Sequence, residues 1–400
     1  MSGQSTAKTV VIVGAGQAGF HCASSLRDRG WNGRIILVGD ETEPPYYRPP
    51  LSKEYLQGRT PGDELPLRPD SFFQRSAIDL ITGDEVRAID RAERRVLLAS
   101  GSHLNYDELV LATGAAPRLP DIEGIGLRGV AVLRDRRDAD ELREQVSRCG
   151  SLVILGGGFI GTEVAAAMAA SREVTIVERW PRILKRSVSA PVAQRAREAH
   201  ESHGVRMRTG SVVTALRGSA GRVRSVQLAD GNRLDADLVL FATGVAPRTA
   251  LATAAGLDVG DGVRVDATLR TSDPRISAIG DCANFPTRFR FSRTRLESVQ
   301  NATDQARHVA ERIVTGTAWP YEAVPWFWTH QYDDKIQIAG IADQNDECVI
   351  IPGRSADSFS VYRVRDGAVV AVESVNAARD HMRARKSLVA GPIPLAELCA

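Results

Sequence analysis

The sequence predicts an α/β protein with two Rossmann-like dinucleotide-binding domains and a smaller α/β domain at the C-terminal end. Two glycine fingerprints support the first part, because each stands between a short apolar strand and a helical stretch. The smaller domain is indicated after residue 320, where an aromatic cluster precedes alternating apolar and polar residues. We expect residues 1–115 and 245–320 to form the first domain, 116–244 the second and 321–400 the third.

Composition places the chain among globular proteins of more than one domain. It has 400 residues, of which 43% are hydrophobic and 25% charged, and such a length exceeds one ordinary core. No run approaches the roughly 18 apolar residues of a membrane span, and the polar start lacks the apolar core of a signal peptide. The net charge of +2 favours neither a nucleic acid nor a membrane as partner. We therefore expect a cytoplasmic protein.

The cysteines give no sign of a metal or a redox disulfide. They are scattered, and none belongs to a CxxC pair, so neither a zinc site nor a vicinal disulfide is signalled. We expect reduced thiols that fill space, and no metal site. The five positions are Cys22, Cys149, Cys282, Cys348 and Cys399.

The first fingerprint follows the apolar run 9–13 (TVVIV), which is typical of a parallel strand buried on both faces. A helix over 20–29 and a strand over 34–38 complete a βαβ unit, with Asp40 and Glu41 at its end. The glycines of such a unit allow a tight turn, close approach to a pyrophosphate and close helix–strand packing. The helix N-terminus offers N–H groups and partial positive charge to the phosphates. Here the glycines are Gly14, Gly16 and Gly19.

The same pattern returns at 151–155 (SLVIL), before a helix expected over 162–170 and a strand over 173–177. Glu178 stands at the tip of that strand, where a carboxylate accepts hydrogen bonds from a ribose and repels a 2′-phosphate. NAD is therefore favoured over NADP, although Arg179 follows directly and keeps NADP open. The glycines of this second fingerprint are Gly156, Gly158 and Gly161.

Three further strands bear on how the domains connect. The segments 109–114 (LVLATG) and 238–244 (LVLFATG) end alike, and we expect each strand at the edge of its domain, where the chain crosses to the next. The segment 275–281 ends in Gly-Asp. In flavoenzymes with two dinucleotide sites, such a strand returns to the first domain and its aspartate binds the flavin ribityl chain. The Gly-Asp strand and the N-terminal position of the first fingerprint together assign FAD to that fingerprint.

The segment 44–53 (PPYYRPPLSK) is the most distinctive of the chain. Its prolines predict a stiff, nearly extended loop that could hold Lys53 near the isoalloxazine ring. A simple proline-rich linker would not explain its place directly after the ribose-binding acid. The stretches 116–129 and 143–148 are interpreted as connection and loop.

Taken together, several motifs resemble the ferredoxin reductase family of oxygenase electron-transfer chains. These motifs are PPYYRPPLSK, GGGFIGTE, ATGVAPR, AIGDCANF, RLESVQNATDQA and PWFWTHQYD. The family includes reductases of the putidaredoxin, rubredoxin and biphenyl dioxygenase type. The resemblance covers nearly the whole chain, and it implies a glutathione-reductase-like fold with an FAD domain, an inserted NAD domain and a C-terminal domain.

The resemblance also implies the site residues. Lys53 is expected to approach the flavin, and Glu163 to pair with Lys53. The FAD set implied is Ala18, Asp40, Lys53, Val86, Arg134, Asp281 and Val299, with Trp328 as a cover for the flavin edge. The nicotinamide cofactor set implied is Gly158, Ile160, Glu163, Glu178, Gly244 and Glu297. One departure from the family is Thr329-His330-Gln331, where Ser-Asp-Gln is usual, so no role for a carboxylate is expected there.

The implied activity is that of a ferredoxin–NAD⁺ reductase with FAD and NADH as cofactors. A hydride passes from NADH to FAD, and single electrons then pass to a 2Fe-2S ferredoxin that feeds a monooxygenase or dioxygenase. An acidic ferredoxin needs a basic docking surface. The candidates are Arg288, Arg290, Arg293 and Arg307. We expect a monomer or a weak dimer.

Three alternatives stay open at this point. Rubredoxin in place of ferredoxin would make the chain a rubredoxin reductase. A disulfide or peroxide reductase of the same fold would need a redox cysteine over the flavin, and no cysteine lies between Cys22 and Cys149. A flavoprotein without enzymatic activity is disfavoured by the complete nicotinamide site with Glu163 and Glu178.

Overall fold

The computed structural model of the chain describes residues 8–394, so Cys399 lies outside the described residues. The described chain forms two compact units, each assembled from separate segments. The first unit contains Met1–Tyr47, Pro66–Ala116 and Ala246–Trp326, and the second contains Arg48–Leu65, Pro117–Val245 and Phe327–Ala400. Within residues 8–394, no helix has the length and apolar character needed to cross a membrane.

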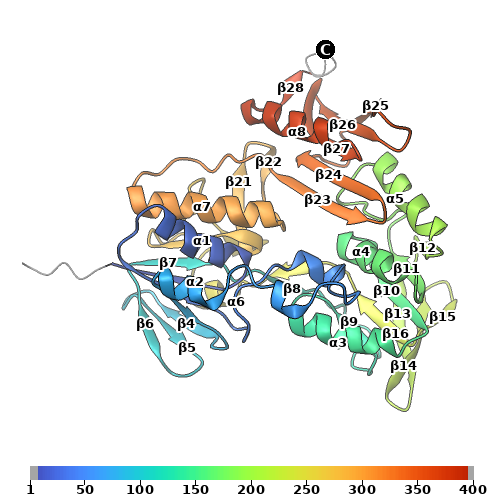
Figure 1. The fold of residues 1–400 in the computed structure, drawn as a ribbon, viewed down its shortest axis with the longest axis horizontal. Coiled ribbons are helices and arrows are strands. Elements are labelled where there is room, and N and C mark those ends of the chain that lie inside the picture. Colours follow the sequence, from blue (N-terminus) through green and yellow to red (C-terminus); the bar gives the residue numbers. More distant parts are fainter. Residues whose placement is uncertain (1–7, 395–400) are drawn as a thin grey trace, which may run out of the picture. The chain divides into compact units, whose positions relative to one another are not determined.

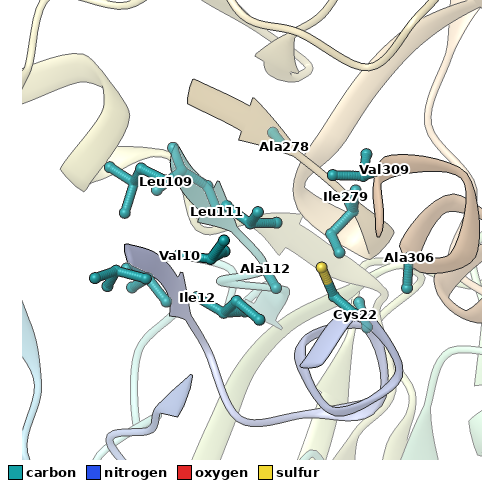
Figure 2. Packing of buried hydrophobic residues seen from close by; sticks show 14 of the residues in the cluster. Val10, Ile12, Cys22, Leu109, Leu111, Ala112, Ala278, Ile279, Ala306 and Val309 are labelled. Atoms are coloured by element: carbon teal, nitrogen blue, oxygen red, sulfur yellow. The ribbon is translucent and has the colours of Figure 1, made fainter. Parts of the chain in front are cut away.

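The first unit is built on a five-stranded parallel sheet in the order β20-β7-β1-β2-β3. Helices α1 (Gln17–Asp28) and α7 (Val299–Thr315) pack against each other beside it (Figure 1). Figure 2 shows the core between them, where apolar strand residues such as Ile12 and Leu111 pack against Cys22 of α1 and Val309 of α7. The strands are β1 (Thr9–Val13), β2 (Arg34–Val38), β3 (Ile78–Ile81), β7 (Glu108–Leu111) and β20 (Ile276–Ala278).

The second unit contains a matching parallel sheet in the order β12-β11-β10-β16-β9. Its strands are β9 (Val130–Val132), β10 (Ser151–Leu155), β11 (Glu173–Glu178), β12 (Arg206–Thr209) and β16 (Leu238–Phe241). Its helices are α3 (Arg136–Ser147), α4 (Phe159–Met168) and α5 (Ala190–Ser202). The predicted βαβ units and the Gly-Asp strand that returns to the first sheet are therefore confirmed.

The chain passes from one unit to the other shortly after β7 and β16, as expected, but neither strand is the outermost of its sheet, because β20 pairs beyond β7 and β9 pairs beyond β16. Both are apolar on both faces, which suits a strand inside a parallel sheet. The stretch 143–148 is not a connection but mostly the end of α3. That helix begins at a capping box, in which Asp135 and Asp138 satisfy each other's backbone N–H groups.

The C-terminal part of the second unit is an antiparallel sheet in the order β23-β24-β27-β26-β25, with β28 beside β27. The alternation of apolar and polar residues noted after residue 320 thus corresponds to strands. The elements are β23 (Trp326–Gln331), β24 (Asp334–Gly340), β25 (Glu347–Pro352), β26 (Phe359–Arg365), β27 (Ala368–Val375), β28 (Ile393–Pro394) and helix α8 (Ala378–Ser387), which packs on β24 and β27.

Smaller elements complete each unit. In the first unit they are α2 (Asp70–Arg75), α6 (Ala250–Ala254), the sheet β4 (Val86–Asp90), β5 (Arg95–Leu98) and β6 (His103–Asn105), and the sheet β18 (Val259–Gly260), β19 (Gly262–Arg264), β21 (Ala283–Thr287) and β22 (Arg290–Thr294). In the second unit they are β13 (Val213–Ser219), β14 (Arg222–Leu228) and β15 (Arg233–Asp235). Two short strands are β8 (Ala115–Pro117) and β17 (Val245–Pro247).

Helix α5 is tied to the end of β23 by a buried histidine. His200 is fully buried, and its Nε2 lies 2.9 Å from the amide oxygen of Gln331. Its Nδ1 lies 3.0 Å from the hydroxyl of Tyr332. Burial lowers the pKa of His200 to about 4, although the hydrogen bond to Gln331 opposes this shift. The imidazole is therefore neutral in the folded protein at physiological pH.

This histidine predicts a loss of stability in mild acid. The folded state binds fewer protons at His200 than the unfolded chain between pH 6.5 and about 4. The free energy of unfolding therefore falls as the pH falls through this window, and above it the group has no effect. Between about pH 7.5 and 4.5, we expect urea unfolding of the wild type to lose roughly 2 kcal/mol more than that of His200→Gln. His203 is an exposed neighbour, and His203→Gln should show the same pH dependence of unfolding as the wild type. An identical pH dependence in His200→Gln would contradict the assignment.

Candidate functional site

The first glycine fingerprint forms a turn that admits no side chain at two positions. Gly14 has φ of +106°, and a Cβ there would lie 2.2 Å from the carbonyl oxygen of Ala112. A Cβ on Gly19 would lie 1.9 Å from the oxygen of Gly14. The N–H of Gly14 donates to Val38 at 2.7 Å, which joins the turn to β2. The predicted reasons for these two glycines are therefore confirmed.

The N-terminus of α1 is arranged to receive an anion. Gly16 is its N-cap, no side chain caps the helix, and its first turn carries no acid, so the first N–H groups stay available. Beside it, a Cβ on Gly280 would lie 3.0 Å from the Cβ of Ala18, which places the short 3₁₀ helix Gly280–Cys282 at the same helix end. Asp281 belongs to this 3₁₀ helix. The 3₁₀ helix that carries Asp281 therefore begins beside Ala18.

A buried amide at the same place also fits a cofactor with many acceptor oxygens. Gln305 of α7 is fully buried and its Oε1 accepts from the N–H of Gly280 at 2.7 Å. Its Nε2 has no hydrogen-bond partner in the described part of the chain. An unsatisfied buried donor is costly, and a diphosphate or ribityl oxygen would satisfy it. Sequence reasoning missed Gln305, although it stands in the quoted segment RLESVQNATDQA.

The other residues proposed for FAD divide between the two units. Asp40 follows β2 and pairs with Arg248 at 2.7 Å in the first unit. Val86 begins β4 and is buried, and Val299 is the first residue of α7. The second unit holds Lys53, Arg134 and Trp328. Arg134 accepts a bond from Arg48 through its carbonyl oxygen, at 2.9 Å, and Trp328 is half-buried on β23.

The second fingerprint repeats the geometry of the first. Gly156 has φ of +114°, and a Cβ there would lie 2.3 Å from the oxygen of Ala242. A Cβ on Gly161 would lie 2.1 Å from the oxygen of Gly156. Gly158 is the N-cap of α4, without a capping side chain or an acid in the first turn, and a Cβ there would meet nothing within 4 Å. This open cradle at a helix N-terminus fits the pyrophosphate of a second dinucleotide.

The acid predicted for the ribose is held beside this cradle. Glu178 ends β11, and its carboxylate accepts from the N–H of Gly157 at 2.7 Å and of Trp180 at 2.9 Å. Arg179 lies over the Trp180 ring, with its guanidinium carbon 4.9 Å from the ring centre. Of the remaining residues proposed for the nicotinamide cofactor, Ile160 is exposed on α4 and Gly244 has φ of +97°. Glu297 differs from them, because it belongs to the first unit, where it pairs with Arg295 at 2.6 Å.

The open space at Gly158 yields a test of the second fingerprint. An alanine there meets no protein atom and keeps an ordinary φ of −81°, so Gly158→Ala should fold normally. Its methyl group would stand where the backbone has to approach a pyrophosphate, so we expect the dissociation constant for NADH to rise tenfold or more, about 1.4 kcal/mol. Calorimetry would measure the dissociation constant for NADH, and thermal unfolding would measure the stability of the variant. Gly161→Ala should instead destabilise the fold, and wild-type affinity in Gly158→Ala would exclude this cradle.

The proline segment departs from the predicted extended loop. Residues Pro49–Ser52 form a 3₁₀ helix instead. Proline fits the first positions of a helical turn, because its φ is preset and the missing N–H would have no partner there. Lys53 directly follows this turn, and its own N–H donates to Pro50 at 2.9 Å. Lys53 is therefore placed at the end of a helical turn and not of an extended loop.

Lys53 and Glu163 form the predicted ion pair, at 2.6 Å, within the second unit. The Lys53 side chain is 19% exposed and that of Glu163 is 5% exposed, so the pair is shielded from water. Glu163 also accepts hydrogen bonds from the hydroxyls of Ser52, at 2.5 Å, and Thr329, at 2.6 Å. Sequence reasoning missed both hydroxyls. The available signal was that position 329 keeps a hydroxyl where the family usually has serine.

The buried thiols offer no redox cysteine. Burial raises the pKa of Cys22 to about 12 and also raises the pKa values of Cys149 and Cys282. A thiol with a raised pKa is a poor nucleophile, because the thiolate is the reactive form. Every cysteine in the described residues is free.

Comparison with known proteins agrees with this geometry. The family model for pyridine nucleotide-disulphide oxidoreductases matches residues 8–306, and the reductase C-terminal family matches residues 326–399. Rhodocoxin reductase of Rhodococcus erythropolis is 44% identical over 388 residues, covering 97% of this chain and 90% of the relative. The solved ferredoxin reductase of Rhodopseudomonas palustris has 46% identity and a TM-score of 0.92, covering 95% of this chain and 94% of its own.

A second solved structure is similar over its length. It is the covalent putidaredoxin reductase–putidaredoxin complex, with 38% identity and a TM-score of 0.92, covering 97% of this chain and 94% of the matched chain. The predicted resemblance and the fold class are thereby confirmed.

Proposed function

Because this chain belongs to the pyridine nucleotide-disulphide oxidoreductase family, we propose that it is an NADH-dependent reductase of a 2Fe-2S ferredoxin. The chain is an oxidoreductase, and FAD and NAD(P)H are its cofactors. When bound, FAD converts the two-electron donation of NADH into single-electron deliveries. The ferredoxin would pass these electrons to a monooxygenase or dioxygenase.

The proposed assignment gives each fingerprint one cofactor. Ala18, Asp281 and the N-terminus of α1 hold FAD, while the Gly158 cradle and Glu178 hold NADH. Preference for NADH over NADPH is supported by Glu178, whose anchored carboxylate would repel a 2′-phosphate.

The observation that carries the proposal is the shielded pair of Lys53 and Glu163. A fixed positive charge, held by a buried carboxylate 2.6 Å away, is suited to stabilise the negative charge that accompanies hydride acceptance. The protein would supply no acid or base for the bond-breaking step beyond this charge. The raised thiol pKa values support an electron route to an external acceptor over one through a cysteine.

The ferredoxin surface that we propose is the hairpin β21–β22, called here the arginine hairpin (residues 283–294). Arg288 and Arg290 flank its tip, and Phe291 beside them is fully exposed. An exposed aromatic ring among cations fits a partner with an apolar spot surrounded by acids. Arg307 of α7 is 57% exposed and pairs with Asp304 at 3.8 Å, and we propose it as a further, separate contact for the ferredoxin. Arg293 has a different role, since it donates to Asn284 at 2.9 Å and to the carbonyl of Val265 and so braces the hairpin.

A charge reversal on this hairpin should separate docking from cofactor chemistry. In Arg288→Glu/Arg290→Glu, we expect the apparent KM for a 2Fe-2S ferredoxin to rise at least tenfold, because two attractive contacts become repulsive. Reduction of ferricyanide by NADH should stay unchanged. Arg87→Glu reverses the charge of one exposed arginine on β4, elsewhere in the first unit, and should leave both assays unaltered. Equal losses with ferredoxin and ferricyanide would refute the docking surface.

The acceptor itself is tested by a panel. Purified plant-type ferredoxin, vertebrate-type ferredoxin and rubredoxin would each be supplied with NADH and the enzyme, with cytochrome c reduction as readout. We expect a 2Fe-2S protein to support the highest rate. If rubredoxin is the best acceptor, the chain is a rubredoxin reductase, and if no acceptor is reduced, the proposal is refuted.

We propose that the protein works in the cytoplasm. The use of NADH and the free thiols of the described residues support a reducing compartment.

A further inference from the structure

A chain of hydrogen bonds extends from Glu163 to the far end of β23. Thr329 donates to Glu163 at 2.6 Å, and the amide nitrogen of Gln331 lies 3.3 Å from the Thr329 hydroxyl and 2.8 Å from that of Thr162. Beyond it stand His200 and then Tyr332. Glu163, Thr329, Gln331 and His200 are each no more than 5% exposed. All belong to the second unit.

The bond directions in this chain follow from chemistry. The Gln331 nitrogen faces two hydroxyl oxygens, so its amide oxygen has to be the acceptor for His200. A neutral imidazole has one donor and one acceptor nitrogen, so Nε2–H of His200 donates to Gln331 and Nδ1 accepts from Tyr332. Thr329 receives a bond from Gln331 and gives its own proton to Glu163. Every donor from Tyr332 onward therefore points toward the carboxylate.

The outer end of the chain is held firmly. Tyr332 has φ of +54°, a conformation that costs energy for a bulky residue. Its ring stacks on His203, with 3.8 Å between ring centres and an interplanar angle of 12°. Helix α5 thus fixes the turn after β23, and with it the register that places Thr329 on Glu163.

We propose that Gln331 and His200 are positioning residues for the Lys53–Glu163 pair. They hold the Thr329 hydroxyl as a donor to Glu163, and aligned donors strengthen one another in a buried chain. The donor dipoles offset part of the Glu163 charge, so Lys53 keeps more of its positive field. This role rests on the proposed function, in which Lys53 serves the flavin.

The consequence is a measurable effect on the flavin. Without the Thr329 donor, the charge of Glu163 is less offset, and the local potential becomes more negative. Reduction of a bound flavin is then less favourable. We expect Thr329→Val to shift the equilibrium between NADH and bound FAD about tenfold toward oxidised flavin, which is about 30 mV for a two-electron couple. Thr329→Ser keeps the hydroxyl and should restore the wild-type midpoint potential.

A second variant tests the chain behind Thr329. Gln331→Met has a similar length but neither an N–H nor a charge, so it removes the donor that orients the Thr329 hydroxyl toward Glu163. We expect a fall in midpoint potential similar to that of Thr329→Val, with the dissociation constant for NADH unchanged. Gln337→Met on the neighbouring strand β24 is a matched control, because Gln337 is also buried and the change is the same. It should change stability but leave the potential alone.

A double variant tests whether Gln331 acts through Thr329. If Gln331 acts through Thr329, Thr329→Val/Gln331→Met should have the potential of Thr329→Val alone, because the second change removes nothing further. Additive shifts, an unchanged potential in Thr329→Val, or an equal shift in Gln337→Met would overturn the inference. Should Gln331→Met not fold, Thr329→Val and Thr329→Ser decide alone. A Lys53→Met variant that reduces its flavin at the wild-type rate would instead overturn the proposed function.

Discussion

Replacing Lys53 with methionine is expected to slow the NADH-dependent bleaching of flavin absorbance roughly 100-fold, a loss typical of removing a charge-stabilising group from an active site. The reason is the fixed charge, which is lost while the length of the side chain is kept. Stopped-flow absorbance under anaerobic conditions would measure it. FAD content should stay at wild-type level, because Ala18, Asp281 and the α1 N-terminus are untouched.

The same substitution also leaves a buried carboxylate without its cation, so a stability effect has to be separated from the rate effect. Glu163 would retain only the hydroxyls of Ser52 and Thr329 as donors. Removing both charges in Lys53→Met/Glu163→Leu should recover much of the lost stability but none of the lost rate. A double variant that regains the rate would show that Lys53 acts only by neutralising Glu163. Wild-type bleaching in Lys53→Met would contradict the role outright.

Glu373→Ala is expected to lower the free energy of unfolding by about 3–5 kcal/mol. Glu373 of β27 is almost fully buried and pairs with Arg363 of β26 at 2.8 Å. It also accepts from the N–H of Ser189 at 2.7 Å and from its hydroxyl at 2.5 Å. Its removal strands a buried guanidinium and two donors at the start of α5, the helix that carries His200.

Urea unfolding would measure this effect, with Glu347→Ala as control. Glu347 is exposed on β25, so its removal should change the free energy of unfolding by less than about 0.5 kcal/mol. Arg363→Met/Glu373→Leu, which removes both charges, should be more stable than Glu373→Ala. If Glu373→Ala lowers the free energy of unfolding by less than about 1 kcal/mol, the Arg363–Glu373 pair does not behave as a buried ion pair and the prediction is contradicted.

The continuous apolar strands could be predicted closely from the sequence. Strands 9–13, 34–38 and 151–155 were expected with the bounds that the structure shows, because β-branched runs between glycine turns leave few alternatives. The helices after the fingerprints begin three residues earlier than predicted, at Gln17 and Phe159. Their N-caps are glycines, which carry no side-chain signal for a helix start.

Polar segments were harder to predict. Helix α3 was missed at 143–148 because its sequence is strongly polar, although the Asp135 capping box was visible in the sequence. Prolines at 49 and 50 suggested an extended loop, yet the same preset φ also fits the first turn of a 3₁₀ helix.

The residues of the candidate site also differ in how well the sequence predicts them. Lys53 and Glu163 were paired from the family resemblance, and the structure contains the pair. The donors Ser52, Thr329, Gln331 and His200 could not be found from spacing. They come from a 3₁₀ turn, an edge strand and a helix that are distant in sequence, and tertiary packing joins them into one hydrogen-bonded cluster in which Ser52 and Thr329 contact Glu163.

In the function that we propose, the enzyme takes two electrons from NADH and delivers them singly to an iron–sulfur protein. The most direct test is an anaerobic titration of the FAD-loaded enzyme and excess oxidised 2Fe-2S ferredoxin with limiting NADH, followed by the absorbance of the ferredoxin. We expect two reduced ferredoxins for each NADH consumed, at a rate that falls in Arg288→Glu/Arg290→Glu. Flavin that NADH reduces but that only a disulfide, a peroxide or dioxygen reoxidises would contradict it.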